Sequence, residues 1–282
     1  MNKSSAAYSA EEKASVETRK PLEEKEYPTS VTIGEPSDIE LIALKETYEG
    51  FPLFKTTISK STFIYTLLTK SVDDSIVERQ AKMAASRTPQ QLDSYYREEV
   101  ITSCVLWPTD FNTIILQQLP AGVEYSLFNK IMAASGMNEP ATGDESIVVP
   151  KPTPEPTPED ISRFKADPRY QRLGLQYRKI NTTIFDGGMP SYLPVGHFIY
   201  TAIERLPYNQ AMTTIMQNPS VSAVEADNIL MEKILKIGVV FPKEFDWDAA
   251  PAGWARLIYQ GIMVLSGFSG TLGVEIEDEQ LV

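Results

Sequence analysis

The residues best suited to chemistry lie in a short acidic and aromatic segment late in the chain. Glu244, Asp246 and Asp248 alternate there with two aromatic side chains. A pair of carboxylates beside an aromatic surface is the arrangement with which a glycosidase protonates a leaving group and activates a nucleophile. An earlier segment, 110–112, has the same aromatic centre but keeps only one carboxylate. This comparison favours a polar loop over a catalytic pair.

The single histidine and the single cysteine are the remaining candidates for catalysis or metal binding. Their numbers exclude a metal site of several histidines, an intramolecular disulfide and a cluster of cysteine ligands. Cys104 and His197 could act as nucleophile and base only if the fold brought them together. Cys104 stands where a second copy of its motif has Gly238, which favours a packed small side chain. Phosphate-binding glycine loops, nucleophile elbows and calcium loops are missing from the sequence. We therefore predict no enzymatic activity, no cofactor and no catalytic, cofactor-binding or metal-binding residue.

The elements that would position these residues occur twice along the chain. The first member of each pair of motifs lies at Phe63–Thr66, Val105–Pro108, Leu119–Gly122 and Ser135–Gly136, and the second at Phe198–Thr201, Val239–Pro242, Ala250–Gly253 and Ser266–Gly267. The order is identical and the spacing drifts by only a few residues. Because a similarity this long exceeds the 20–50 residues of a solenoid or propeller unit, it indicates two copies of one small domain.

Each copy is expected to begin with a β-hairpin and to continue with helices. Two β-branched and aromatic runs, 53–58 and 62–68, are separated by a break of hairpin length, and runs 177–185 and 197–203 repeat this around a turn at 187–188. Helix starts are expected after caps at Ser71, Thr88 and Ser222, and after the Pro-Ala-Gly turns. We also expect Trp107 and Phe241 to pack against the last helix of their own copy. The predicted fold class is α+β, predominantly helical, as a tandem duplication of a small domain with a β-hairpin followed by several helices.

Composition shifts suggest the domain boundaries. We predict a disordered arm at 1–30, a first repeat domain at 31–137, a proline-rich linker at 138–165, a second repeat domain at 166–270 and an acidic tail at 271–282. The prolines of the linker favour an extended polyproline-II spacer, because proline fixes φ and removes a backbone donor. The two domains are therefore expected to share only a small interface.

Overall composition limits the classes of partner. The formal net charge of −12 disfavours binding to a phosphate backbone, which needs clustered cations. Hydrophobic residues make up 42% of the chain and charged residues 23%, but no apolar run reaches the length of a membrane span. The first 28 residues lack the apolar core of a secretory signal. We predict neither nucleic acid nor membrane as a partner.

One family shares the combination of motifs in the first copy. The Phe-Ile-Tyr-Thr strand, the acidic helix leading into Cys104–Pro108, and the helix that opens at Leu119–Val123 and closes at Ser135–Gly136 resemble a tail-assembly protein family of large tailed bacteriophages. The resemblance covers residues 50–137 well and 188–268 more loosely. It marks packing residues, so no functional residue is carried over from the family.

The resemblance implies a non-enzymatic protein of phage tail or baseplate assembly, or a structural protein of the virion. Such a protein would act as a protein–protein adaptor, similar to a tail-assembly chaperone, on other tail or baseplate proteins. It would be located in the host cytoplasm during assembly or in the tail of the virion. Homo-oligomerisation and retention in the mature particle stay open. The alternative is a carboxylate-dependent hydrolase that acts on cell-wall polymer through Glu244, Asp246 or Asp248.

Overall fold

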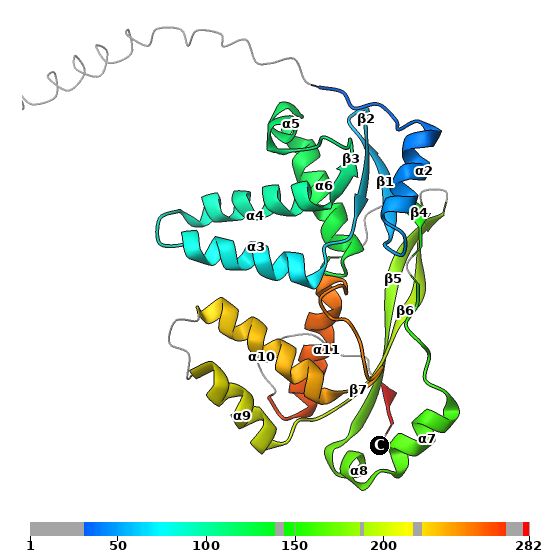
Figure 1. Cartoon of the computed structure of the whole chain (residues 1–282), viewed down its shortest axis with the longest axis vertical. Helices are drawn as coiled ribbons and strands as arrows, with labels where there is room; N and C mark the ends of the chain where they lie inside the picture. Colours follow the sequence, from blue (N-terminus) through cyan, green and yellow to red (C-terminus); the bar gives the residue numbers. More distant parts are fainter. Residues whose placement is uncertain are drawn as a thin grey trace, which may run out of the picture. The chain divides into compact units, whose positions relative to one another are not determined.

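Two four-stranded antiparallel sheets organise the part of the chain that the computed structural model describes, and helices pack against both (Figure 1). The described residues are 31–138, 144–149, 151–186, 189–216, 222–268 and 279–281. We call 31–149 the N-terminal half and 151–281 the C-terminal half. More of the described residues lie in helices than in strands, so the predicted α+β, predominantly helical class is confirmed. Within these residues, no helix combines the length and the apolar character that crossing a bilayer requires.

The sheet of the N-terminal half has the strand order β3-β2-β1-β4. Its strands are β1 (Leu53–Ile58), β2 (Ser61–Thr66), β3 (Val105–Trp107) and β4 (Asp144–Val148). β1 and β2 form the predicted hairpin, and Ser59 and Lys60 between them have φ values of 50° and 70°. Two successive residues with positive φ give the type I′ turn, whose twist matches that of the strands it joins.

The sheet of the C-terminal half has the order β7-β6-β5-β8. Its strands are β5 (Leu175–Asp186), β6 (Met189–Thr201), β7 (Val239–Phe241) and β8 (Glu279–Gln280). The hairpin strands β5 and β6 have 12 and 13 residues, whereas β1 and β2 have 6 each. This hairpin is therefore longer than predicted, because pairing continues through residues 189–196, which precede the second predicted run. Its predicted turn at 187–188 lies outside the described residues.

Helices follow the hairpin in both halves, as predicted. The N-terminal half contains α2 (Asp38–Thr47), α3 (Lys70–Met83), α4 (Pro89–Cys104), α5 (Thr113–Gln118) and α6 (Ala121–Ala134). The C-terminal half contains α7 (Pro158–Ala166), α8 (Pro168–Leu173), α9 (Arg205–Met216), α10 (Ala223–Gly238) and α11 (Ala252–Leu265). Helix α2 precedes the first hairpin, and α7 and α8 precede the second, which was not predicted. The predicted caps of α4 and α10 are confirmed: Thr88 accepts a hydrogen bond from the backbone N–H of Gln91, and Ser222 accepts one from that of Glu225.

The N-cap of α3 lies two residues before the predicted one. Thr69 is the N-cap rather than Ser71, and its side chain makes no capping bond. The backbone N–H groups of Lys70 and Ser71 instead donate to the carbonyls of Ala250 and Asp248, at 2.9 and 3.3 Å. A contact with the C-terminal half thus satisfies donors that a side-chain cap would otherwise serve.

Regular structure also occurs within the ranges predicted as linker and tail. Range 138–165 contains strand β4 and most of helix α7, and range 271–282 contains strand β8. Pro158 occupies the first turn of α7, directly after the N-cap Thr157. The prolines of this range were predicted to form an extended linker, so this helix start was missed. Thr153 donates its backbone N–H to the carbonyl of Val195 at 2.7 Å, so this part of the linker is tied to β6. The arm at 1–30 and residues 139–143, 150, 269–278 and 282 lie outside the described residues.

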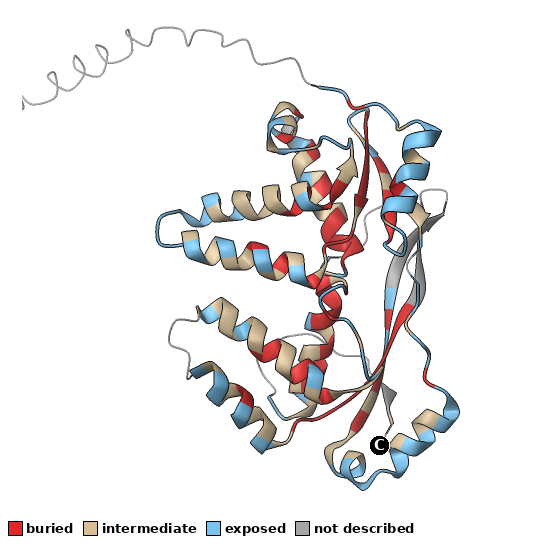
Figure 2. Cartoon of the chain, viewed as in Figure 1, coloured by how far each residue is buried: buried red, intermediate tan, exposed pale blue. Residues whose placement is uncertain are grey.

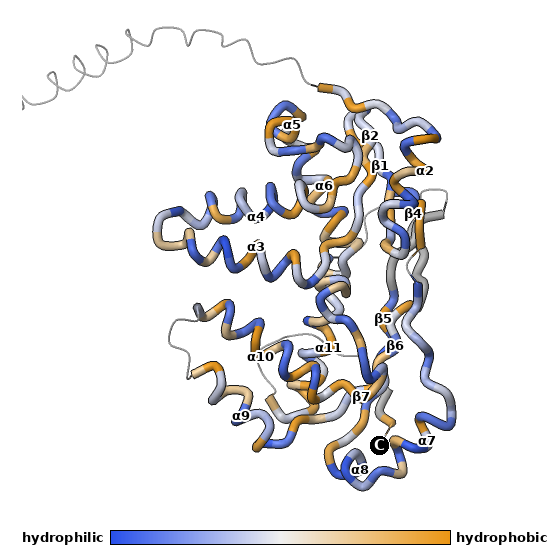
Figure 3. Tube along the Cα trace, in the orientation of Figure 1, coloured by the Kyte–Doolittle hydropathy of each residue, from blue (hydrophilic) through white to orange (hydrophobic). Residues whose placement is uncertain are grey.

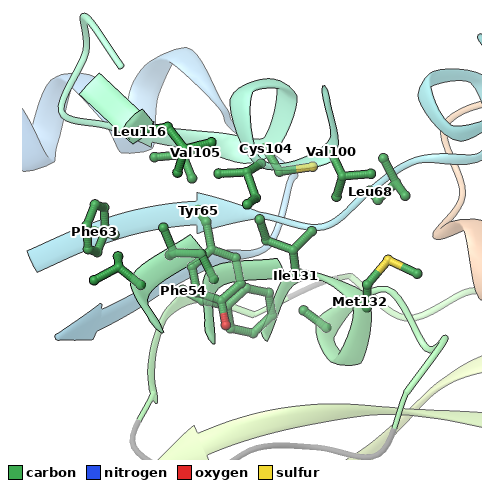
Figure 4. Packing of buried hydrophobic residues seen from close by; sticks show 14 of the residues in the cluster. Phe54, Phe63, Tyr65, Leu68, Val100, Cys104, Val105, Leu116, Ile131 and Met132 are labelled. Carbon is green, nitrogen blue, oxygen red and sulfur yellow. The ribbon is translucent and has the colours of Figure 1, made fainter. Parts of the chain in front are cut away.

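Each sheet is covered on both faces, as the distribution of buried residues in Figure 2 indicates. In the N-terminal half, Phe54 and Tyr65 stack with ring centroids 5.4 Å apart at the centre of the larger cluster, and Cys104 packs in the same cluster (Figure 4). Leu44 of α2 covers the opposite face of this sheet. Burial of these apolar side chains provides the main driving force for folding.

Trp107 is only partly buried, and it contacts the clusters on both faces of the N-terminal sheet. Its Nε1–H donates to the carbonyl of Gly34 at 3.0 Å. Phe241 packs with Leu175 and Ile199 on the face covered by α7. The expectation that Phe241 packs against the last helix of its copy is therefore wrong, because its cluster holds residues of α7 and α8 rather than of α11. Trp107 does pack in part against the cluster that contains α6.

Matching hydrogen bonds fix the end of the hairpin in both halves. The Oγ of Ser135 accepts the backbone N–H of Leu68 at 2.7 Å, and the Oγ of Ser266 accepts that of Ile203 at 2.8 Å. In each case the serine that closes the last helix holds the segment that follows the second hairpin strand. The Trp107–Pro108 and Phe241–Pro242 peptide bonds are both cis.

Candidate functional site

Backbone hydrogen bonds and an ion pair join the two halves at a junction. Residues 68–71, which follow β2, run beside residues 248–252. The backbone N–H of Lys70 donates to Ala250 at 2.9 Å, and that of Ala252 donates to Leu68 at 3.0 Å. The expectation of a small interface between independent domains is wrong in this respect, because the halves share backbone hydrogen bonds.

Helix α11 begins where helix α6 ends (Figure 1). The backbone N–H of Gly253, in the first turn of α11, donates to the carbonyl of Ser135 at 3.0 Å. A backbone N–H at the start of α11, which has no acceptor within its own helix, is thus paired with a backbone carbonyl at the end of α6. A Cβ on Gly253 would lie 2.4 Å from the carbonyl oxygen of Gly136, so only glycine permits this approach without a backbone shift.

A buried carboxylate crosses the junction. Asp73 of α3 is 1% exposed, and its Oδ1 accepts the hydroxyl of Tyr96 at 2.7 Å. Its Oδ2 accepts a hydrogen bond from Nη2 of Arg256, which belongs to α11, at 2.5 Å. Burial and the charge of Asp73 raise the pKa of the Tyr96 hydroxyl, which therefore stays a hydrogen-bond donor. These contacts join α3, α4 and α11 and use both oxygens of the carboxylate.

A second polar cluster opens into a groove between α3 and α10. Lys70 is 4% exposed, and its Nζ lies 2.5 Å from Asp74 Oδ2 and 3.8 Å from Asp248 Oδ1. Burial raises the pKa of Asp74, and the neighbouring Lys70 only partly opposes that effect. The groove has a volume of about 310 Å³ and is also lined by Glu78, Glu225 and Glu232.

The chemistry of this groove is that of paired charges. Glu232 accepts a hydrogen bond from Lys236 at 2.5 Å, and Asp74 is bonded to Lys70, so neither carboxylate is free to act as a lone base. In the described part of the chain, no group of three or more acidic, histidine or cysteine side chains is arranged to hold a metal ion. The arrangement can bind cationic groups by charge, and Lys70 of α3 pairs across the junction with Asp248 at 3.8 Å.

An apolar cavity of about 270 Å³ lies on another side of the junction. Phe51, Pro52 and Leu67 line it from the N-terminal half, and Phe245 and Trp254 are among its residues from the C-terminal half. Lys151 and Asp246 are the charged residues of its lining. The cavity can receive a small apolar group near one charge of each sign.

The carboxylates singled out in the sequence have separate roles. Asp246 Oδ1 accepts the backbone N–H groups of Asp248 and Ala249 at 3.1 and 3.2 Å, which closes a turn. Asn112 makes the corresponding bonds in the N-terminal half. Asp248 lines the acidic groove and Glu244 is exposed.

The aromatic residues between these carboxylates belong to the hydrophobic core. Trp247 is buried and stacks on Phe198 with ring centroids 5.2 Å apart. Phe245 contacts the same ring edge to face, at a centroid distance of 5.0 Å. Both rings therefore pack with the core of the C-terminal half, and Phe245 also lines the apolar cavity.

The structure places Cys104 and His197 in different halves. Cys104 is buried in the N-terminal core, where burial and the charge of Asp73 raise the pKa of its thiol to about 12. His197 Nδ1 lies 2.7 Å from the hydroxyl of Tyr177 on the neighbouring strand. The thiol packs as the comparison with Gly238 predicted, and the two side chains belong to separate networks.

The residues that form the junction were not predicted from the sequence. Lys70, Asp73, Tyr96 and Arg256 belong to no recognisable motif. Asp73 and Arg256 are 183 positions apart in the chain, so no local spacing could have paired them. The one available signal is the glycine of the Pro-Ala-Gly turn, Gly122 in the first copy and Gly253 in the second, because a helix disfavours glycine.

Comparisons with known proteins identify no relative. No protein-family model, curated protein or solved structure matches this chain.

Proposed function

We propose that the chain is a tandem duplication of one α+β unit and acts as a non-enzymatic protein–protein adaptor in the assembly of a phage tail or baseplate. The duplication is supported by the equal strand orders of the two sheets, β3-β2-β1-β4 and β7-β6-β5-β8. It is also supported by the matching bonds of Ser135 and Ser266. The tail or baseplate assignment rests on the family resemblance of residues 50–137 and 188–268.

The observation that carries the adaptor role is the junction. Backbone hydrogen bonds and the Asp73–Arg256 ion pair hold the halves together, so their outer surfaces keep a fixed relative orientation. A rigid adaptor loses less conformational entropy on binding two partners than one with a flexible spacer. The polar side chains of the junction are used within the chain, which fits a supporting role.

The proposal is tested in the infected cell. An affinity-tagged chain is recovered during phage infection, and its complexes and the purified particles are analysed by mass spectrometry. We expect tail or baseplate proteins in the complexes. Their presence with the chain absent from finished particles identifies an assembly factor, and presence in both identifies a virion component. Recovery of the chain without any tail or baseplate protein would overturn the proposal.

The hydrolase alternative rests on the apolar cavity, since Asp246 lines it beside Phe245 and Trp254. Its test is release of soluble fragments from purified cell-wall polymer by the full chain. The triple variant Glu244→Gln, Asp246→Asn, Asp248→Asn is compared with the parent for fragment release and for melting. Activity that disappears in a variant with unchanged melting would favour the hydrolase.

A further inference from the structure

The outward face of helix α2 is apolar at its centre. Ile39 is 80% exposed and Ile42 is 56% exposed, although Leu44 on the inward side is buried against the sheet. Residues three apart are neighbours on a helix surface, so the two isoleucines form one patch. Figure 2 shows that α2 is largely exposed, and Figure 3 shows hydrophobic residues along it. We call Ile39 and Ile42 the α2 patch.

The corresponding helix of the C-terminal half lacks this patch. Both α2 and α7 begin with a capping box, Ser37 with Glu40 and Thr157 with Asp160, and both cover the second face of their sheet. Counting from these caps, Glu159 and Ser162 of α7 take the places of the two isoleucines, and both are exposed.

This difference shows that the architecture does not require isoleucine at either position. Helix α7 folds against its sheet with a charged and a polar residue there. Exposed isoleucines cost solvation free energy in the free protein, which a partner would recover by covering them. The difference from α7 therefore makes the patch a candidate docking surface.

The charges around the patch indicate the chemistry of that occupant. Asp38, Glu46 and Glu49 are exposed on or next to α2, and Lys45 is the one basic residue of the helix. The whole chain carries a formal net charge of −12, which disfavours a second copy as the occupant. A partner segment with positive charges would be favoured in both affinity and association rate.

We propose that the α2 patch docks an amphipathic segment of a partner protein that carries apolar side chains flanked by Lys or Arg. The apolar side chains cover Ile39 and Ile42, and the cations lie against Asp38, Glu46 and Glu49. This inference rests on the proposed adaptor function and names the surface that function uses.

The first experiment maps the occupant by photo-cross-linking. A benzophenone amino acid is placed at Ile42 of the full chain in infected cells, and at Ser162 of α7 as the matched control. We expect cross-links from position 42, absent from position 162, to a segment of another protein rich in Lys or Arg and apolar residues. Cross-links from position 42 to residues 1–30, to a second copy of the chain or to an acidic segment would overturn the proposal, as would equal yields at the two positions.

The second experiment measures the contribution of the patch. The variant Ile39→Glu, Ile42→Ser gives α2 the residues of α7, and Glu159→Ala, Ser162→Ala is the control. With the cross-linked segment as a synthetic peptide, we expect the first variant to lose affinity about 10- to 100-fold and the control to change less than about 2-fold. Affinity should also fall with rising salt concentration. Because both isoleucines are exposed, melting should be unchanged, and an unchanged affinity in the folded variant would refute the docking site.

The two proposals fail in distinguishable ways. If the cross-linked segment belongs to a basic protein outside the tail and baseplate, the docking site stands and the assembly function fails. If tail or baseplate proteins are recovered equally with parent and variant, the assembly function stands and the docking site fails.

Discussion

The two halves build the same strand order with different polar interiors. In the N-terminal half, the buried hydroxyl of Tyr65 donates to Asp144 at 2.9 Å, and Lys130 pairs with the same carboxylate at 2.7 Å. In the C-terminal half, the hydroxyl of Tyr200 donates to Gln176 at 2.9 Å. Both tyrosines are 0% exposed. The shared strand therefore requires a buried tyrosine whose hydroxyl is satisfied, and leaves the choice of acceptor free.

Glycines mark where the C-terminal half is packed more tightly. Gly261, at the place of Lys130, would put a Cβ 2.3 Å from the hydroxyl oxygen of Tyr200. Gly238, at the place of Cys104, would put one 2.8 Å from a side-chain carbon of Ile262. A position that holds a long or sulfur-containing side chain in one half holds glycine in the other, where a Cβ would displace the side chain of Tyr200 or Ile262. The comparison teaches that backbone order is shared while packing is specific to each half.

The largest effect is expected at the junction, where Arg256 pairs with a buried carboxylate and the corresponding Tyr125 is exposed. Replacing Arg256 by Met leaves the buried Asp73 carboxylate with Tyr96 as its remaining donor. We expect a loss of about 3 kcal/mol of unfolding free energy, the low end for an unpaired buried charge, because Tyr96 still donates. Urea denaturation measures this loss.

The matched control for that substitution is Tyr125→Met at the corresponding place in α6. Tyr125 is 59% exposed, so its replacement should cost less than about 0.5 kcal/mol. Equal losses in the two variants would mean that the ion pair does not stabilise the junction.

The second comparison uses the glycines of the two Pro-Ala-Gly turns. A Cβ at Gly253 would meet the backbone of Ser135 and Gly136 at 2.6 and 2.4 Å, whereas a Cβ at Gly122 has nothing within 4 Å. Gly253→Ala should therefore destabilise the protein by about 2 kcal/mol through overpacking. Gly122→Ala should stabilise it by about 0.5–1 kcal/mol, because alanine restricts the unfolded chain. Thermal melting distinguishes the signs, and two changes in the same direction would contradict the close approach of α6 and α11.

The smallest difference is expected between the two closing serines. Ser135→Ala and Ser266→Ala each leave one backbone N–H, of Leu68 or Ile203, without its acceptor. Each should cost about 1–2 kcal/mol, and Ser135 should cost more because it is 0% exposed while Ser266 is partly exposed. Denaturant midpoints measure both values. An unchanged denaturant midpoint in one of the two variants would show that the two hydrogen bonds do not contribute equally to stability.

Much of the local structure could be predicted from short-range patterns. The hairpin of β1 and β2, the caps at Thr88 and Ser222, and helix ends before Gly136 and Gly267 all depend on residues within a few positions of one another. Side-chain caps and glycines of positive φ act within one turn of backbone, so their signals remain visible in sequence. The polar turn in place of a catalytic pair at Asp246 was also favoured by comparing the two copies.

Only the tertiary structure decided the junction, the edge strands and the exposure of the α2 patch. Strands β4 and β8 are short and become strands by pairing with β1 and β5, which are distant in sequence. The partners Asp73 and Arg256 are 183 residues apart, and the exposure of Ile39 becomes clear only once Leu44 faces the sheet. A chain encodes local geometry in neighbouring residues, but it encodes burial and long-range pairing only through the whole set of contacts, because each such contact needs both partners in place.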